Sequence, residues 1–155
     1  MKVRDIMSKP VIHVGSETPI ADVAELLARK QISAVPITDE RGAVVGLVSE
    51  YDLIARQGKV ARDIMSAGVI SVTEDADVED VRFLLIERRI RRVPVMAGTQ
   101  LVGIVSRSDI VRLMALHWIC EVCGEQARGE RAPEICAKCA APGNRFRQEA
   151  VQPGM

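Results

Sequence analysis

The strongest constraint on the fold of this chain is an internal repeat with an offset of 58 residues. The hexapeptide VRDIMS, residues 3–8, returns as ARDIMS at residues 61–66, and the apolar positions that follow keep this offset. The offset then falls to 57 for the octapeptides GLVSEYDL, residues 46–53, and GIVSRSDI, residues 103–110. Such self-similarity indicates two copies of one supersecondary unit, here called the first and second copies.

Each copy predicts the element order β-α-β-β-α. In the first copy Thr18 is expected to be a helix N-cap and Pro19 the first helical residue, and apolar residues then recur at helical spacing. Two β-branched runs around residues 39–42 predict a hairpin, after which a helix begins at Ser49. One copy alone would bury little surface. The pair is therefore expected to share a core, either for stability alone or to form a ligand cleft between the copies.

The repeated Ser-x-x-Asp pattern has two interpretations. A Ser at a helix start with Asp three residues later forms a capping box, which needs no ligand. Alternatively, the helix start and its Ser hydroxyl bind phosphate, and the acceptor-only carboxylate binds the paired hydroxyls of a ribose. Spacing alone favours the cap. The candidates are Ser49 and Asp52 in the first copy, and Ser106 and Asp109 in the second.

Four arginines precede the second hairpin. They could offset the dipole of a helix C-terminus, clamp a phosphate through bidentate bonds, or face a dimer partner. For the phosphate role, Arg91 and Arg92 are stronger candidates than Arg88. The first copy has Ser33 and Ala34 in the corresponding region.

The tail carries two C-x-x-C pairs in a chain with no other cysteine. Cys120, Cys123, Cys136 and Cys139 have the spacing of a tetrahedral four-thiolate metal site. Disulfides or loose thiols are the alternatives, and a reducing compartment disfavours disulfides. Zinc and a single iron both suit four thiolates, and zinc is slightly favoured because no partner redox centre is visible in the chain. Gly124 fits a knuckle turn with positive φ, whereas Ala140 departs from that pattern.

The composition excludes several other classes. The net charge is zero, and the tail from Cys120 has five basic and five acidic residues, which disfavours a nucleic-acid or membrane-surface role. Apolar runs are too short to span a membrane, and the N-terminus lacks a signal-peptide pattern, so a cytoplasmic location is expected. With two histidines and no phosphate loop of the Walker type, we do not expect an enzyme.

The order of these motifs resembles known families. DIM, a helix, VP opening a hairpin and G-φ-V-S-x-x-D-φ, twice within about residues 1–116, resemble a tandem pair of CBS domains. Residues 118–146, WICEVCG followed by APEICAKC, resemble the rubredoxin-like zinc ribbon of rubrerythrins. We therefore expect an α+β fold with pseudo-twofold symmetry, formed by CBS domains at residues 1–58 and 59–117 and followed by a four-cysteine ribbon at residues 118–155.

The resemblance also implies a function. CBS pairs are regulatory modules that bind AMP, ADP, ATP or S-adenosylmethionine in clefts between the two copies, and two pairs often form a homodimer. The Ser contacts phosphate, the Asp binds ribose, and residues near the VP step and the first apolar strand lie beside the base. An iron protein for electron transfer or redox sensing and a zinc-ribbon transcription regulator are the alternatives, and the regulated partner is unknown. The expected nucleotide-binding residues are Ser49, Asp52, Ser106, Asp109, Arg91, Arg92, Ser33, Ala34 and Ile12.

Overall fold

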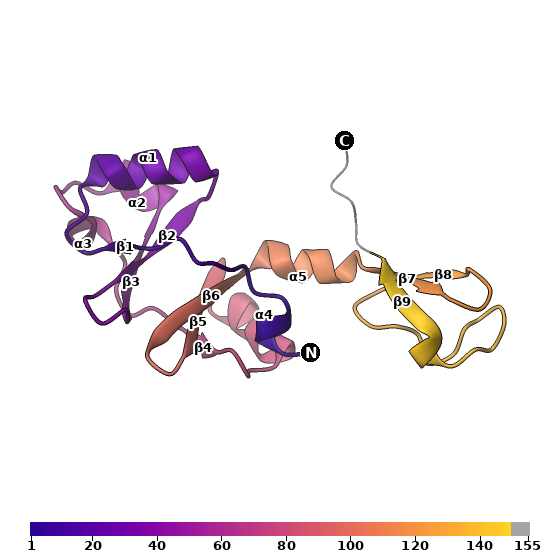
Figure 1. Cartoon of the computed structure of the whole chain (residues 1–155). Coiled ribbons are helices and arrows are strands. Elements are labelled where there is room, and N and C mark those ends of the chain that lie inside the picture. Colours follow the sequence, from indigo (N-terminus) through magenta and orange to yellow (C-terminus); the bar gives the residue numbers. More distant parts are fainter. Residues whose placement is uncertain (150–155) are drawn as a thin grey trace. The chain divides into compact units, whose positions relative to one another are not determined.

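The computed structural model describes residues 1–149 and divides the chain into two compact units (Figure 1). The first unit is Met1–Ser106, and the second begins at Arg107. The ribbon predicted at residues 118–155 therefore includes six C-terminal residues that lie outside the described part. Among the described residues, no helix has the length and hydropathy needed to cross a membrane.

The first copy forms a three-stranded sheet in the order β1-β2-β3. Strand β1 (Val14–Gly15) pairs in parallel with β2 (Ala34–Thr38), which pairs antiparallel with β3 (Val44–Ser49). Helix α1 (Ile20–Lys30) connects the two parallel strands, and α2 (Glu50–Ala55) follows the hairpin. The predicted β-α-β-β-α order is confirmed for this copy.

The second copy repeats this topology in a sheet of order β4-β5-β6. Strand β4 (Val72–Thr73) is parallel to β5 (Arg92–Ala97), and β6 (Gln100–Ser106) closes the hairpin. Helix α4 (Val78–Glu87) connects β4 to β5. The last helix of the repeat, α5 (Arg107–Met114), is the first element of the second unit.

The start of α1 differs from the prediction by one residue. The helix begins at Ile20, and Pro19 is its N-cap in an extended conformation without a side-chain cap bond. The prediction of Thr18 as the N-cap is therefore wrong. The carbonyl oxygen of Thr18 accepts the N–H of Ala61 at 2.9 Å, so the backbone there stays extended to bind a segment 43 residues away in the sequence.

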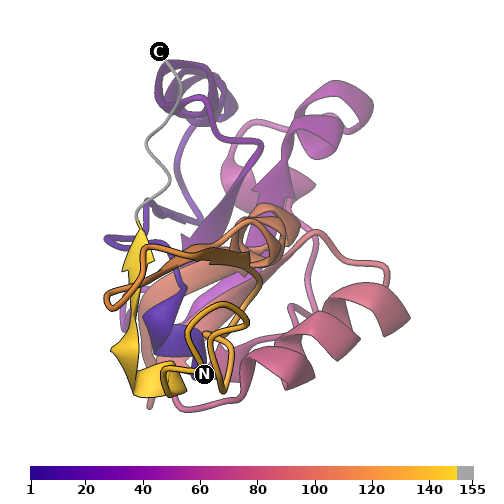
Figure 2. The same cartoon turned by 90° about the vertical axis from the view of Figure 1, so that its right-hand side faces the viewer.

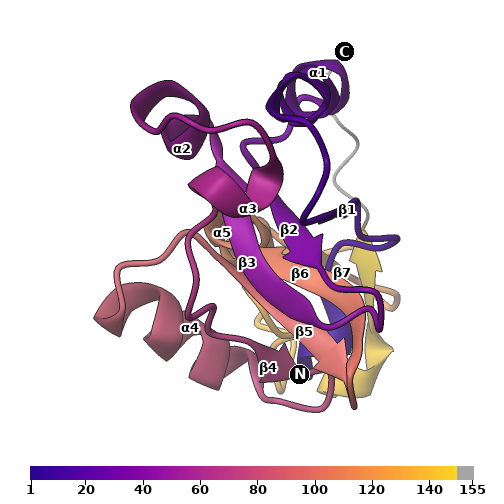
Figure 3. The same ribbon diagram turned by 90° about the vertical axis from the view of Figure 1, so that its left-hand side faces the viewer.

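The opening segment of each copy packs against the other copy. Near the N-terminus, after the short helix η1 (Val3–Asp5), the N–H of Ser8 donates to the carbonyl of Ile104 in β6 at 2.9 Å. In the same way the N–H of Ser66, after helix α3 (Ala61–Ile64), donates to Leu47 in β3 at 2.8 Å. Figure 3 shows α3 beside β3 and the N-terminus beside β4.

This exchange joins the two cores. One buried cluster holds side chains from α1, β2 and β3, and it also includes two side chains from the opening of the second copy. Its members are Val23, Leu27, Val35, Ile37, Val48, Ala61 and Ile64. Because Ala61 and Ile64 are fully buried in the core of the first copy, this core is incomplete without the second copy.

Two close contacts explain the Gly and the Met of the repeated motifs. A Cβ on Gly46 would lie 2.5 Å from the Sδ of Met65, and a Cβ on Gly103 would lie 2.3 Å from the Sδ of Met7. Only glycine allows a methionine to pack this closely on the strand. The Met of each DIM segment therefore packs against the octapeptide of the other copy, and this packing requires glycine at the first position of that octapeptide.

The second unit continues from α5 into a small antiparallel sheet of order β8-β7-β9. Its strands are β7 (His117–Cys120), β8 (Gln126–Arg128) and β9 (Phe146–Glu149), with a short helix η2 (Gly143–Arg145) before the last. The indole Nε1 of Trp118 donates to the carbonyl of Gly129 at 2.9 Å, which ties β7 to the first loop. Figure 2 views this ribbon from the end that carries its loops.

Candidate functional site

The capping box predicted at Ser49 and Asp52 is present at the start of α2. The N–H of Ser49 donates to Oδ2 of Asp52 at 2.9 Å, and the N–H of Asp52 donates to the Ser49 hydroxyl at 3.3 Å. The Asp52 carboxylate is buried, and its Oδ1 lies 3.5 Å from Nε of Arg56. Asp52 thus turns one oxygen back to its own helix, while the other has only a long contact with Arg56.

Both residues of this capping box also line a cavity of about 300 Å³. The first copy contributes the ends of its hairpin strands and the start of α2. The second copy contributes the loop after its DIM segment and the approach to β5. The lining residues are Ala34, Leu47, Ser49, Asp52, Ser66, Ala67, Gly68, Val69, Ile70, Ile90, Arg91 and Arg92. Five residues predicted from the sequence are therefore brought together: Ala34, Ser49, Asp52, Arg91 and Arg92.

Two guanidinium groups give the cavity a cationic side. Arg92 is half-buried, and this desolvation, together with the nearby charge of Arg91, holds the pKa of Arg92 below its usual value. The negative charge of Glu50 acts in the opposite direction and raises this pKa. Its Nη2 donates a hydrogen bond to the hydroxyl of Ser33. Ser33 therefore binds an arginine of the cavity and is not itself a lining residue. The apolar part of the lining, with Ile70 and Ile90 among its side chains, can bury a flat ring.

The remaining predicted residues lie elsewhere. Ile12 packs against the core of the first copy and does not line this cavity. Ser106 ends β6 and pairs with Arg92 of β5. Asp109 is buried on α5, and its Oδ1 accepts a bond from Nη2 of Arg112 at 2.8 Å. Ser106 is the last residue of the first compact unit, and Asp109 belongs to the second.

The loop at residues 66–70 lines the cavity but was not predicted from the sequence as part of the site. Its Gly68 has φ of +70°, a conformation that favours glycine. A signal for this loop was present, because the offset of 58 places Ile70 opposite Ile12. Applying the repeat to Ile12 would have identified Ile70.

The four cysteines form a second candidate site in the ribbon. Their sulfur atoms all lie within 4.8 Å of one another, with Cys120 3.7 Å from Cys139 and Cys123 3.6 Å from Cys136. Disulfide-bonded sulfurs would be about 2.05 Å apart. Four sulfurs bound tetrahedrally to one ion at about 2.3 Å would be about 3.8 Å apart, so the arrangement fits a metal ion.

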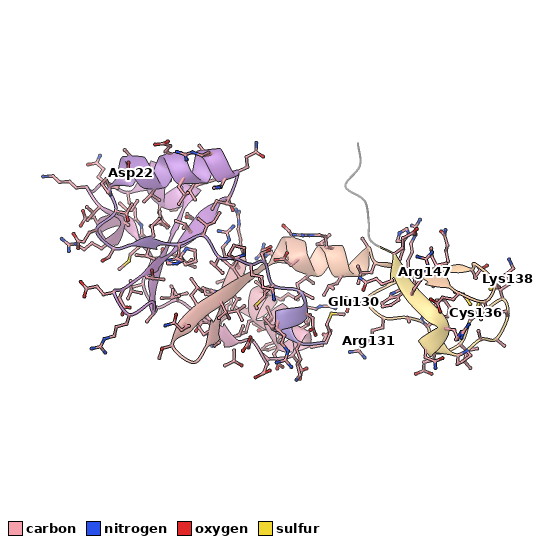
Figure 4. All side chains as sticks on the ribbon, viewed as in Figure 1. Asp22, Glu130, Arg131, Cys136, Lys138 and Arg147 are labelled. Atoms are coloured by element: carbon pink, nitrogen blue, oxygen red, sulfur yellow. The ribbon has the colours of Figure 1, made fainter. Side chains whose placement is uncertain are left out.

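The cluster favours the thiolate form at Cys136, whereas desolvation and the neighbouring thiols raise the pKa of Cys123 to about 12 and also raise the pKa of Cys139. The N–H groups of Cys139 and Lys138 bond to the sulfur of Cys136 and lower its pKa to about 7. Gly124 follows the first knuckle with φ of +74°, as predicted, and Ala140 takes the same left-handed conformation after the second, with φ of +59°. Cys136 and Lys138 lie at the end of the second unit opposite α5, while Arg147 lies on β9 (Figure 4).

Comparisons with known proteins identify both parts of the chain. The family model of the CBS domain matches residues 3–59 and 61–116. A second model, described as a rubrerythrin, rubredoxin-like domain, matches residues 118–147. The chain therefore belongs to the family of CBS domain proteins and carries a C-terminal rubredoxin-like domain, as the sequence motifs predicted.

One similar curated protein is the L-aspartate semialdehyde sulfurtransferase of Methanocaldococcus jannaschii. It is 36% identical over 115 residues, which cover 72% of this chain and 23% of that protein. An uncharacterized protein of Methanopyrus kandleri is 34% identical over 123 residues, which cover 73% of this chain and 62% of that one. The chain thus matches only part of the length of these relatives.

Two similar solved structures contain adenosyl ligands. CBSX2, solved in complex with AMP, is 33% identical with a TM-score of 0.68, covering 72% of this chain and 93% of that one. The CBS domain pair of protein MJ0100, solved with 5′-methylthioadenosine and S-adenosyl-L-methionine, is 36% identical with a TM-score of 0.69, covering 73% and 94%. These ligands belong to those proteins.

Proposed function

We propose that this chain is a regulatory module that binds an adenosyl ligand in the cavity between its two copies. The observation that carries the proposal is that this cavity unites Ser49 and Asp52 of the first copy with Arg91 and Arg92 of the second. The AMP and S-adenosylmethionine of the solved relatives support the adenosyl class. In this proposal the two CBS domains are residues 1–58 and 59–117, and the ribbon is residues 118–155.

The proposed roles follow from the chemistry of the lining. Oδ1 of Asp52 accepts a hydrogen bond from a ribose hydroxyl, because its only other contact among the described residues is the 3.5 Å one with Arg56. Oδ2 continues to cap α2. Ala34 and Ile70 leave an apolar surface for the adenine. Ser49 contributes its hydroxyl to the polar end of the ligand. In this proposal the cap and the ligand site are the same pair of residues.

The repeat supports a second, related cleft. The offset places Ser106 and Asp109 in the positions of Ser49 and Asp52, with Ser33 and Ile12 as further candidates. Two molecules are proposed to pair through their CBS domains. The exposed apolar side chains of α4, such as Phe83, which is 63% exposed, support such a homodimer. Sedimentation velocity at several concentrations tests this, and a monomer throughout contradicts it.

We propose that the ribbon holds one metal ion and that this ion is a structural zinc. Bound by Cys120, Cys123, Cys136 and Cys139, such an ion fixes the two knuckles of the ribbon. The rubredoxin-like match favours iron as the second candidate, and iron would make the ribbon an electron-transfer or redox-sensing site. Elemental analysis of the purified protein distinguishes the two, since one equivalent of iron with visible thiolate-to-iron absorption contradicts zinc. Four thiols free of disulfides support a reducing, cytoplasmic setting.

The proposed role is signalling and not catalysis. The match to the sulfurtransferase covers only 23% of that enzyme, so it does not carry a catalytic role over to this chain. The CBS family model covers residues 3–59 and 61–116, which supports a regulatory role. Only two residues separate the end of helix α5 at Met114 from the start of β7 at His117. We propose that ligand binding is communicated through α5 to the ribbon or to an unidentified protein partner.

Calorimetric titration of the full chain with AMP, ATP and S-adenosylmethionine tests the binding proposal. The double variant Asp52→Ala with Asp109→Ala is expected to bind the ligand with an affinity that is lower by about tenfold or more, because a hydrogen bond to a charged group contributes ~1.5–3 kcal/mol. Asp63→Ala is the matched control. Its carboxylate caps α3 by accepting from Lys59 and Val60 at 2.9 and 3.1 Å, but it lies outside the cavity lining. Unchanged affinity in the double variant would contradict the assignment.

A further inference from the structure

Arg56, the C-cap residue of α2, returns to Asp52 through both its backbone and its side chain. Its N–H donates to the carbonyl of Asp52 at 3.1 Å, and its Nε lies 3.5 Å from Oδ1 of Asp52. Asp52 lines the cavity between the copies, whereas Arg56 is not one of the lining residues. Arg56 therefore reaches the cavity through this carboxylate.

The same guanidinium also binds the opening segment of the second copy. Its Nη1 donates to the carbonyl oxygens of Ile64 and Met65, both at 3.4 Å, where α3 ends. Arginine side chains commonly bond the last carbonyls of a helix in this way. This segment is anchored, because the side chain of Ile64 is fully buried in the core of the first copy. The guanidinium is thus held beside Asp52 by backbone groups that are themselves fixed.

These contacts fix both oxygens of the Asp52 carboxylate. Oδ2 accepts the N–H of Ser49 at 2.9 Å and its hydroxyl at 3.0 Å, while Oδ1 faces Arg56. The side chain of Asp52 is only 5% exposed, and a buried carboxylate needs such partners. An ionised carboxylate offers roughly four acceptor sites. The long contact with Arg56 therefore orients Oδ1 and still leaves it able to accept a further hydrogen bond.

The second copy makes the same contact with a different residue. The offset of 57 aligns Arg56 with the buried Leu113, yet Nη2 of Arg112 lies 2.8 Å from Oδ1 of Asp109. In each copy an arginine about one turn after the Asp thus contacts Oδ1, although the two arginines are not equivalent in the repeat. This recurrence points to a role for the contact itself.

We propose that Arg56 is a positioning residue that holds Oδ1 of Asp52 where a ribose hydroxyl binds it. The inference rests on the proposed function and adds to it a residue outside the cavity lining. Arg56 does not touch the ligand and acts through Asp52. Its loss is therefore expected to reduce the affinity for ligands whose ribose carries hydroxyl groups, because Oδ1 accepts from those hydroxyls and not from the base or the phosphate.

The test is calorimetric titration of the full, metal-loaded chain with AMP and with 2′,3′-dideoxy-AMP, which lacks both ribose hydroxyls. Because the two ligands carry the same phosphate, any long-range effect of the Arg56 charge is common to both. Arg56→Met keeps a long side chain but removes the charge and the donors. This variant is expected to bind AMP about tenfold more weakly, since a hydrogen bond to a charged group is lost or misaligned. Its affinity for the dideoxy analogue should change by less than about twofold.

Three further variants separate positioning from a general structural role. Arg62→Met is the matched control, because Arg62 on α3 pairs with Glu17 outside the cavity lining, and it should change neither affinity by more than about twofold. Arg56→Lys returns a cation to the side of Oδ1 and should bind AMP within about threefold of the unaltered chain. In an Asp52→Ala background, Arg56→Met should change AMP affinity by less than about twofold, because the residue through which it acts is gone. Thermal unfolding verifies that each variant is folded.

The outcomes distinguish this inference from the proposed function. If the unaltered chain does not bind AMP, the proposed function fails and the inference fails with it. If the unaltered chain prefers AMP to the dideoxy analogue but Arg56→Met weakens both equally or neither, the proposed function stands and Arg56 is not a positioning residue. An effect of Arg56→Met that persists in the Asp52→Ala background also overturns the inference.

Discussion

The repeat pair and the ribbon reach a folded state by different physical means. The first unit buries a continuous set of aliphatic side chains, and Val35, Ile37 and Ile64 are fully buried. The buried cluster of the ribbon consists of Cys120, Cys136 and Ala141, against which Cys123 and Phe146 pack. Three of these five residues are expected metal ligands. The first unit can be stable through apolar burial, whereas the ribbon depends on its metal ion.

The largest effect should come from removing the metal. Chelation, or Cys120→Ser with Cys136→Ser, is expected to unfold the ribbon, because structural zinc contributes an apparent ~10–16 kcal/mol in small domains. Trp118 is the only tryptophan of the chain and lies in β7, so its fluorescence reports on the ribbon alone. The thermal transition of the CBS pair should stay unchanged. Loss of the metal without any change in Trp118 fluorescence would contradict this comparison.

A substitution in the apolar core should destabilise the CBS pair and leave the metal site of the ribbon unchanged. Ile37→Ala is expected to lower the free energy of unfolding of the CBS pair by about 2–5 kcal/mol, since Ile37 is fully buried between α1, β3 and α3. Metal content should not change. Ile135→Ala is the control, because Ile135 is 64% exposed in the ribbon and its loss should cost less than about 0.5 kcal/mol. Chemical denaturation measures both.

The close Gly–Met contacts predict a smaller effect. Gly46→Ala is expected to cost about 1–3 kcal/mol, because the new methyl group would overlap the Sδ of Met65. Gly15→Ala is the control, since the nearest atom to its added Cβ is 4.0 Å away. Combining Gly46→Ala with Met65→Ala should relieve the overlap. If Gly46→Ala alone is no more destabilising than Gly15→Ala, the account of this contact is wrong.

The two knuckles of the ribbon predict the smallest effect. Ala140 holds a left-handed conformation that costs about 1 kcal/mol for a residue with a Cβ, so Ala140→Gly should tighten metal binding by roughly fivefold. Gly124→Ala should weaken metal binding by a similar factor, because Gly124 has φ of +74°. Competition with a chromogenic chelator measures both constants. A weaker site in Ala140→Gly would contradict the strain argument.

Local order and chemistry could be predicted from the sequence because they depend on short-range patterns. Alternating and helical spacing specified the strands and helices of each copy, and the C-x-x-C pairs specified the sulfur cluster. The Ser49–Asp52 cap also followed from a spacing of three residues. These features need no knowledge of which distant segment packs on which.

The exchange between copies could not be predicted in this way. The structure buries Ala61 and Ile64 in the core of the first copy. The two copies have nearly equal apolar patterns, so the sequence does not show which core receives which opening segment. The same ambiguity misplaced the start of α1, because the carbonyl of Thr18 binds Ala61 of the other copy. For the same reason, the contribution of residues 66–70 to the cavity could not be predicted. Which of two similar copies a segment packs against is decided by tertiary contacts and not by the local pattern.

The most direct test of the central claim is a crystal structure of the full chain grown with saturating AMP. The account predicts AMP in the cavity between the copies, with a ribose hydroxyl on the Asp52 carboxylate and phosphate oxygens on Arg91 and Arg92. The capping bond from the N–H of Ser49 to Asp52 should persist beside the ligand. An empty cavity under these conditions, or AMP bound with its phosphate away from both arginines, would contradict the account.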